Sequence, residues 1–145
     1  MRWVTRRHIR VNRTATAWLV KRFIDPAATF EFCAPEAVAG FQQDGAIGFD
    51  APSARYPHKD DQGRCSFEAL VHEHVAGDAA LRRMAAIVHG ADFRDVPDAP
   101  LESAGLRAIS HSFPAVAVSD DETLAKATFL YDALYATLAE QDGKR

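Results

Sequence analysis

Residues 11–33 read VNRTATAWLVKRFIDPAATFEFC, and this stretch decides the class of fold. Asn12 or Thr14 can cap a helix that runs to Ile24, where an Asp-Pro step follows. The residue before a proline disfavours helical backbone, so we expect the helix to end there. The alternating segment 29–33 is typical of a β-strand. A helix that leads directly into a strand predicts a domain of mixed α and β structure.

Shorter segments with strand character flank this stretch on both sides. Residues 4–5 and 46–49 each predict a short strand. Residues 50–64 contain two prolines and a glycine and predict a long loop. Loops of this length in a small domain are often functional, so we expect chemistry close to it.

The second half of the chain is predicted to be helical. Residues such as Ser66, Asp78 and Ser119 are suited to cap helices at residues 67–75, 79–89, 100–110 and 119–140. Gly90 is expected to stop the second of these helices, and the last is apolar nearly all round, which is typical of a central, buried helix. The elements together predict one helix-rich α+β domain over residues 1–145, with about five helices and a small β-sheet.

Composition indicates an ordinary globular domain, which we expect to be cytoplasmic. The 145 residues are 48% hydrophobic and 26% charged, which is the balance of a folded chain. No apolar run is long enough to span a membrane, and no apolar leader follows Met1. The two cysteines form no CxxC pair and are expected to be free thiols.

Positive charge is concentrated at the N-terminus. The first 22 residues contain seven lysines and arginines and no acidic residue, although the whole chain has a net charge of −3. Such asymmetry can mark a face that binds anions or nucleic acid, or a solvated basic end that balances an acidic body. The sequence leaves both interpretations open.

Two charged residues lie where the helical pattern is apolar. At about 100° per residue, Arg22 falls on the same stripe of the first helix as Leu19 and Phe23. Asp132 lies among aromatic and aliphatic residues of the last helix. A buried charge needs a partner, so the two residues predict either an ion pair with each other or an anion-binding Arg22.

The segment His58 to Glu68 carries the densest chemistry. Cys65 lies at or just before the start of a predicted helix, where the helix dipole would lower the pKa of a thiol, or it is simply a small buried hydrophobic residue. Glu68 and His72 are four residues apart and share a helix face, so both could bind one metal ion with His58 as a third ligand.

Several blocks of the sequence, taken in order, resemble one known family. They are RTATAWLVKRFIDP at 13–26, CSFE at 65–68 with His58 upstream, GAD at 90–92, GLRAIS at 105–110 and YDALY at 131–135. This set is similar to the C-terminal domain of chromate-resistance proteins of the ChrB type. The chain departs from the family pattern at Asn12, Thr16 and residues 111–113.

The resemblance implies a domain of chromate and metal stress that binds a metal ion or a small oxyanion. We expect a metal site of His58, Glu68, Asp92 and Asp132, which as mixed nitrogen and oxygen ligands would suit Zn, Mn or Fe. Arg13 and Arg22 are then the expected partners of the anion.

Two alternatives stay open beside this hypothesis, and with them the question of whether the chain is an enzyme. The first alternative is a thiol- or metal-dependent enzyme of redox or sulfur-transfer chemistry with Cys65 as the catalytic residue. The second is a regulatory module without chemistry. We expect no membrane partner and no nucleic-acid binding by this chain alone, and a homo-oligomer remains open.

Overall fold

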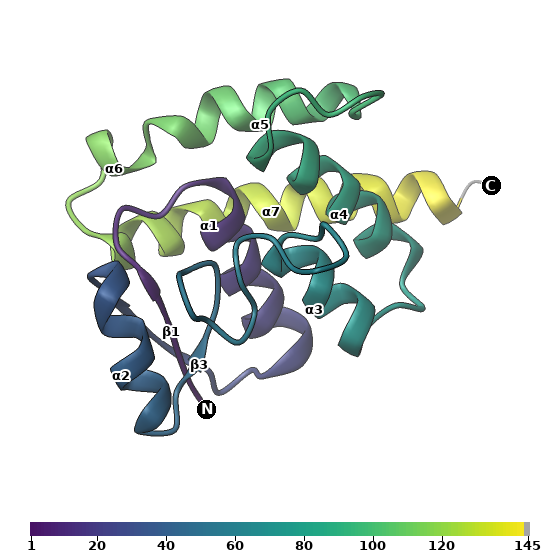
Figure 1. Ribbon diagram of the computed structural model, residues 1–145. Helices are drawn as coiled ribbons and strands as arrows, with labels where there is room; N and C mark the ends of the chain where they lie inside the picture. The colour runs from purple at the N-terminus through teal and green to yellow at the C-terminus, as the bar shows by residue number, and fades with distance from the viewer. Residues whose placement is uncertain (144–145) are drawn as a thin grey trace.

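A three-stranded parallel sheet organises the computed structural model, which describes residues 1–143 (Figure 1). The strands are β1 (Arg2–Arg6), β2 (Thr29–Cys33) and β3 (Ile47–Gly48), in the order β2-β1-β3. In β1, Trp3 is paired with Phe30 of β2 and with Ile47 of β3. All three predicted strands are present, and the one at 29–33 has the predicted bounds.

Helices cover both faces of this sheet because successive residues of β1 point to opposite sides. Trp3 belongs to the larger core, together with the helix α1 (Val11–Leu19). Val4 belongs to a smaller core with Cys33 and Val38, the first residue of α2 (Val38–Gln43). A short 3-10 turn, η2 (Pro35–Ala37), leads from β2 into α2.

The first helix, α1, is the central helix of the domain. Every residue of α1 except Arg13 is buried. Around it pack α3 (Ser66–His74), α4 (Ala79–Asp92), α5 (Leu101–His111) and α7 (Asp120–Gly143), and the short α6 (Phe113–Val116) joins the last two (Figure 1). The alanines and threonines of α1 allow this close approach, because they leave little side chain between neighbouring helices.

The expectation that the last helix is central and buried is wrong. Only one stripe of α7 is buried, formed by Thr123, Ala127, Tyr131 and Leu138. Spacings of four and seven residues place these side chains on one helix face. Phe129 points away from that face and is 81% exposed. Residues beside this stripe, such as Leu134 and Tyr135, are only partly buried against the core.

A π-helical turn, η1 (Val20–Ile24), continues α1 and changes the phase of its side chains. The amide of Asp25 donates to the carbonyl of Val20 at 2.7 Å, five residues earlier. A π-turn holds more residues per turn than an α-helix, so positions beyond it no longer follow the 100° spacing. For this reason Arg22 does not lie in the apolar stripe where the sequence predicts it. Its side chain is 47% exposed.

The ends of α4 and α3 differ from prediction. Helix α4 continues through Gly90 to Asp92, so Gly90 does not end the helix. Instead, Gly90 allows a close contact between α4 and α5. A Cβ atom at Gly90 would lie 2.5 Å from Oγ of Ser103 on α5. Helix α3 is capped by Cys65 and not by Ser66. The hydroxyl oxygen of Ser66 instead accepts a hydrogen bond from the side-chain amide of Asn12 at 2.9 Å.

The predicted cap of the first helix at Asn12 or Thr14 is wrong, because α1 begins at Val11 after Arg10 and both residues lie inside it. The caps predicted at Asp78 and Ser119 are confirmed. Asp78 accepts a hydrogen bond from the amide of Leu81, and Ser119 accepts one from the amide of Glu122. The class of fold is also confirmed as helix-rich α+β with a small sheet. The helix count was low, because residues 1–143 include the short α2 and α6 that were not predicted. None of the helices in this range is both long and apolar enough to cross a membrane.

Candidate functional site

The carboxyl ends of the strands meet the N-terminus of α1 at one edge of the sheet. β1 ends at Arg6, β3 is followed closely by Asp50, and α1 begins at Val11. The chain leaves β1 toward β2 on one side and returns to β3 on the other, so this edge is a topological switch point. Such crevices at the carboxyl ends of parallel strands are the usual ligand sites of open α/β sheets.

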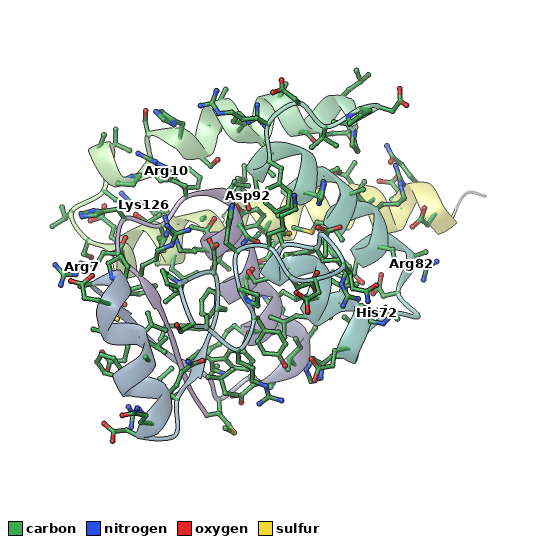
Figure 2. The ribbon with its side chains drawn as sticks, in the orientation of Figure 1. Arg7, Arg10, His72, Arg82, Asp92 and Lys126 are labelled. Atoms are coloured by element: carbon green, nitrogen blue, oxygen red, sulfur yellow. The ribbon has the colours of Figure 1, made fainter. Side chains whose placement is uncertain are left out.

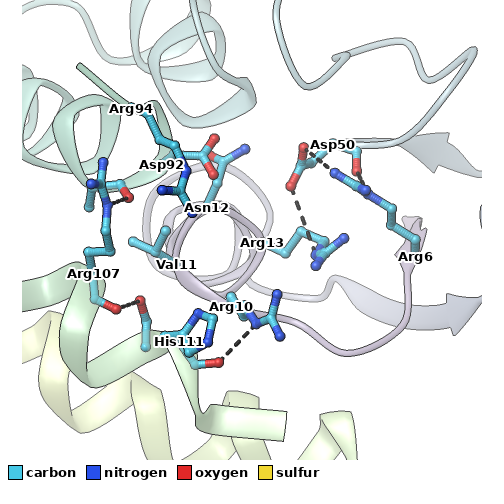
Figure 3. A pocket seen from close by; sticks show the side chains of 12 residues that line it. Arg6, Arg10, Val11, Asn12, Arg13, Asp50, Asp92, Arg94, Arg107 and His111 are labelled. Carbon is cyan, nitrogen blue, oxygen red and sulfur yellow. Dashed lines mark hydrogen bonds and ion pairs between the residues drawn. The ribbon is translucent and has the colours of Figure 1, made fainter. Parts of the chain in front are cut away.

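A cavity of about 260 Å³ opens at this edge (Figure 3). Its lining is unusually rich in arginine and comes from β1, the start of α1, the end of α4 and α5. The lining residues are Arg6, Arg10, Val11, Asn12, Arg13, Asp50, Ala91, Asp92, Arg94, Arg107, Ser110 and His111.

Asp50 holds the cations on one side of the cavity. It is 3% exposed and has a left-handed backbone conformation, with φ of 47°. Its carboxylate lies 3.3 Å from Nη2 of Arg6 and 3.9 Å from Nε of Arg13, and it binds Nδ1 of His58 at 2.9 Å. Strained backbone conformations of this kind gather at functional sites, where surrounding contacts hold them in place.

Four of the arginines around the cavity are anchored by backbone carbonyl groups, and the first of them, Arg6, donates to the carbonyl of Asp50 at 2.8 Å. Arg10 donates from Nε to His111 at 2.9 Å, and Arg13 donates from Nη2 to His8 at 3.0 Å. Arg107 donates to the carbonyls of Gly90 and Ala91 at the end of α4, which places a cation at a helix C-terminus. These bonds fix the guanidinium groups without neutralising them.

Helix α1 adds its positive N-terminal end to this cavity. No side chain caps α1, and its first turn contains no acidic residue. Residues Val11, Asn12 and Arg13 of this turn line the cavity. An uncapped helix N-terminus directs backbone N–H groups and the positive end of the helix dipole at a ligand.

Asp92 is the unusual acid of the cavity. Its side chain is 14% exposed, and its Oδ2 accepts no hydrogen bond from the residues that the structure describes. That oxygen lies 3.5 Å from Nδ1 of His58. Burial, and secondly the negative charge of Asp50, raise the pKa of Asp92 to about 6. Figure 2 shows Asp92 in the middle of the molecule.

The structure brings together only part of the predicted site. Arg13 and Asp92 line the cavity, and His58 contacts both Asp50 and Asp92 from the loop. The hydrogen bond with Asp50 raises the pKa of His58, which favours the imidazolium form. Arg22 lies elsewhere and forms a two-bonded pair with Asp132, at 2.7 and 3.0 Å. The predicted pairing of these two residues is present, but on the surface.

Of the four predicted metal ligands, only His58 and Asp92 lie together, and Glu68 and Asp132 bind other partners. Glu68 binds Nδ1 of His89 at 2.6 Å, and Asp132 accepts from Arg22 and Trp18. His72, on α3, is exposed and lies toward the edge of the view in Figure 2. Among residues 1–143, no group of three or more His, Cys, Asp or Glu side chains is arranged to hold a metal ion. The metal site stays a prediction.

Of the two interpretations of Cys65, the structure agrees with the small buried residue and not with a thiol of lowered pKa. Cys65 does lie at the N-cap of α3, but it is fully buried. Burial, followed by the charge of Glu68, raises the pKa of the Cys65 thiol well above its usual value. Desolvation of the thiolate outweighs the helix dipole here, because full burial disfavours the charged form by up to several pKa units, whereas a helix dipole typically contributes about 0.3–1 kcal/mol.

Sequence reasoning missed most of the cavity. Arg6 and Arg10 belong to the basic segment that was noticed, but nothing in the sequence separates them from Arg2 or Arg7. Asp50, Arg94 and Arg107 gain their role only from the parallel strand order and the contact between α4 and α5. His111 also lines the cavity and was not predicted as a site residue.

Comparison with known proteins agrees with the resemblance of the sequence. Residues 3–138 match the family model described as ChrB, C-terminal domain. The chain is 37% identical over 134 residues to Protein ChrB of Cupriavidus metallidurans, covering 92% of this chain and 39% of that protein. No solved structure matches significantly. Because the family model covers nearly the whole chain, this chain belongs to the ChrB C-terminal domain family.

Proposed function

We propose that this chain takes part in chromate resistance by binding a small tetrahedral oxyanion in the arginine-lined cavity. The observation that carries the proposal is the convergence of Arg10, Arg13 and Arg94 on the uncapped N-terminus of α1. The family supports the link to chromate, since the sequence resembles chromate-resistance proteins. The relative that it matches is much longer, so the proposal concerns this domain alone.

The balance of charge in the cavity favours an anion over a cation. Five arginines line it with two carboxylates. One carboxylate, Asp50, is already engaged by Arg6, Arg13 and His58. Arg94 has no ion-pair partner among residues 1–143, and Arg10 uses only Nε for its backbone contact. Free guanidinium donors in fixed positions suit the bonding geometry of an oxyanion.

The test of this function is direct binding of chromate and sulfate to single-residue variants. Replacing Arg10 or Arg94 with alanine is expected to raise the dissociation constants of both anions by about tenfold or more, because each change removes charge-assisted hydrogen bonds. The matched control is Arg22→Ala, which removes an arginine that pairs with Asp132 outside the cavity. Isothermal titration calorimetry gives the dissociation constants.

Two outcomes would contradict the proposal. Arg22→Ala could weaken the anion as much as Arg10→Ala, which would place the site near Asp132 instead. Wild-type protein could also fail to bind either anion, which would leave the arginine-lined cavity without this role. A thermal melt of each variant separates lost binding from lost folding.

Anion binding is expected to strengthen as the pH falls from 7 to 5. Asp92, with a pKa of about 6, is mostly ionised at pH 7 and would repel an anion, whereas at pH 5 it is mostly neutral and can donate a hydrogen bond. His58, whose pKa is raised, gains charge in the same direction. Arg6, Arg13 and Asp50 are the other charged groups that act on Asp92 or His58.

Sulfate is the appropriate probe for this pH series because it remains a dianion over the whole range. We expect its affinity to rise by about tenfold between pH 7 and pH 5, the effect of a favourable change of about one pKa unit. Asp92→Asn should still bind sulfate but lose most of the pH dependence. His58→Gln measures how much of the pH dependence comes from the imidazole. An unchanged pH profile in Asp92→Asn would assign the effect to another group.

A further inference from the structure

A second, larger cavity, called the outer cavity, shares four lining residues with the arginine-lined inner cavity. The outer cavity has a volume of about 730 Å³, against about 260 Å³ for the inner one. Both are lined by Arg6, Arg10, Arg13 and His111, so the same guanidinium groups face both spaces. A ligand anchored on these arginines can therefore extend outward without any rearrangement of the chain.

The character of the wall changes from the inner to the outer cavity. Arg7, His8 and Ser112 add polar groups to the outer cavity. The rest of its wall, apart from the shared arginines and His111, is formed by Ala34 and Pro35, just after β2, and by Pro114 and Ala115 of α6. None of these side chains can donate or accept a hydrogen bond. A bare oxyanion bonds only to donors, so this wall contributes to binding only if the ligand also has an organic part.

We propose that the natural ligand of this site is an organic phosphate, with its phosphate group at the arginines and its organic group against the outer wall. This inference rests on the proposed oxyanion site and names its ligand class. The size fits, because the outer cavity lies within the range of about 300–1,000 Å³ typical of small-molecule sites. Chromate then binds as a tetrahedral mimic of the phosphate group and displaces the organic ligand.

The geometry divides the two parts of the ligand between different elements. The phosphate group meets the N-terminal turn of α1 and the side chains of Arg10 and Arg13. The organic group meets Ala115, which is exposed on α6. A large side chain at position 115 would fill the outer cavity and leave the guanidinium groups in place, so the two parts can be tested separately.

The experiment compares adenosine monophosphate and phenyl phosphate with inorganic phosphate by calorimetry on the intact chain. We expect at least one of the two organic phosphates to bind about tenfold or more tightly than inorganic phosphate. Adenosine and phenol, which lack the phosphate group, are expected not to bind. Added chromate should weaken the binding of the organic phosphate competitively.

Ala115→Trp is expected to remove the advantage of the organic phosphate and leave the affinity for inorganic phosphate unchanged. The control is Ala136→Trp, an equal change at an exposed position of α7 away from the cavity, which should alter neither. The inference is overturned if both organic phosphates bind no more tightly than inorganic phosphate, or if Ala115→Trp weakens all ligands equally. If inorganic phosphate and chromate also fail to bind, the oxyanion site itself is refuted.

Discussion

Replacing Asp50 with alanine is expected to lower the free energy of unfolding by about 3 kcal/mol. Removing one member of a fully buried ion pair typically costs about 3–5 kcal/mol, because the remaining charge is left without a partner. Asp50 is 3% exposed, but Arg6 and His58 are partly exposed and can regain water, so the lower end applies. Urea denaturation of both proteins measures the difference.

Asp61→Ala is the matched control for this change. Asp61 lies in the same loop, is exposed, and forms no ion pair within the described residues. We expect its loss to change stability by less than about 0.5 kcal/mol, as for most surface substitutions. If the two variants were equally stable, Asp50 would not be the residue that holds the arginines together. A second readout is sulfate binding, which should fall in Asp50→Ala even where the protein remains folded.

Replacing Trp18 with alanine is expected to cost about 4 kcal/mol, within the usual range of about 3–5 kcal/mol for a buried tryptophan. Trp18 is 2% exposed and contacts the rings of Phe23, Tyr131 and Tyr135, with centroids 5.5 to 6.0 Å away. Its Nε1 also donates to Asp132 at 2.8 Å. The substitution leaves a cavity between α1 and α7 and removes this hydrogen bond.

Phe129→Ala provides the comparison on α7, because this aromatic residue is 81% exposed. The sequence alone gives no reason to treat the two aromatic residues differently. The structure predicts a large loss of stability for one and almost none for the other. Equal losses, measured by thermal or urea denaturation, would restore the interpretation of α7 as a helix buried on all sides.

Local signals in the sequence predicted the local structure well. The strand at 29–33 was predicted because its alternation is unbroken, and Asp78 was predicted as a cap because its side chain can reach the first free amides of a helix. These signals act over a few residues. They do not depend on which other elements are adjacent.

The errors have a different physical origin. The predicted position of Arg22 on the helix face was wrong because the prediction assumes a constant angle per residue. The π-turn changes that angle and cannot be recognised from the apolar pattern. The interpretation of Cys65 as a thiol of lowered pKa failed because it considers only the start of the helix. The burial that raises the pKa depends on packing against other elements. The cavity was missed because Asp50 and Arg107 approach the start of α1 only through strand order and helix packing.

The central position of α1 has a consequence for synthesis on the ribosome. Within this domain, α1 is synthesised long before α7, the helix that packs over it. Thr14 is bonded to Tyr131, 117 residues later, at 2.6 Å, and Asp120 binds the amides of His8 and Ile9. Until α7 has emerged, the apolar side chains of α1 have no complete partner surface, so the nascent chain passes through a stage open to chaperone binding and aggregation.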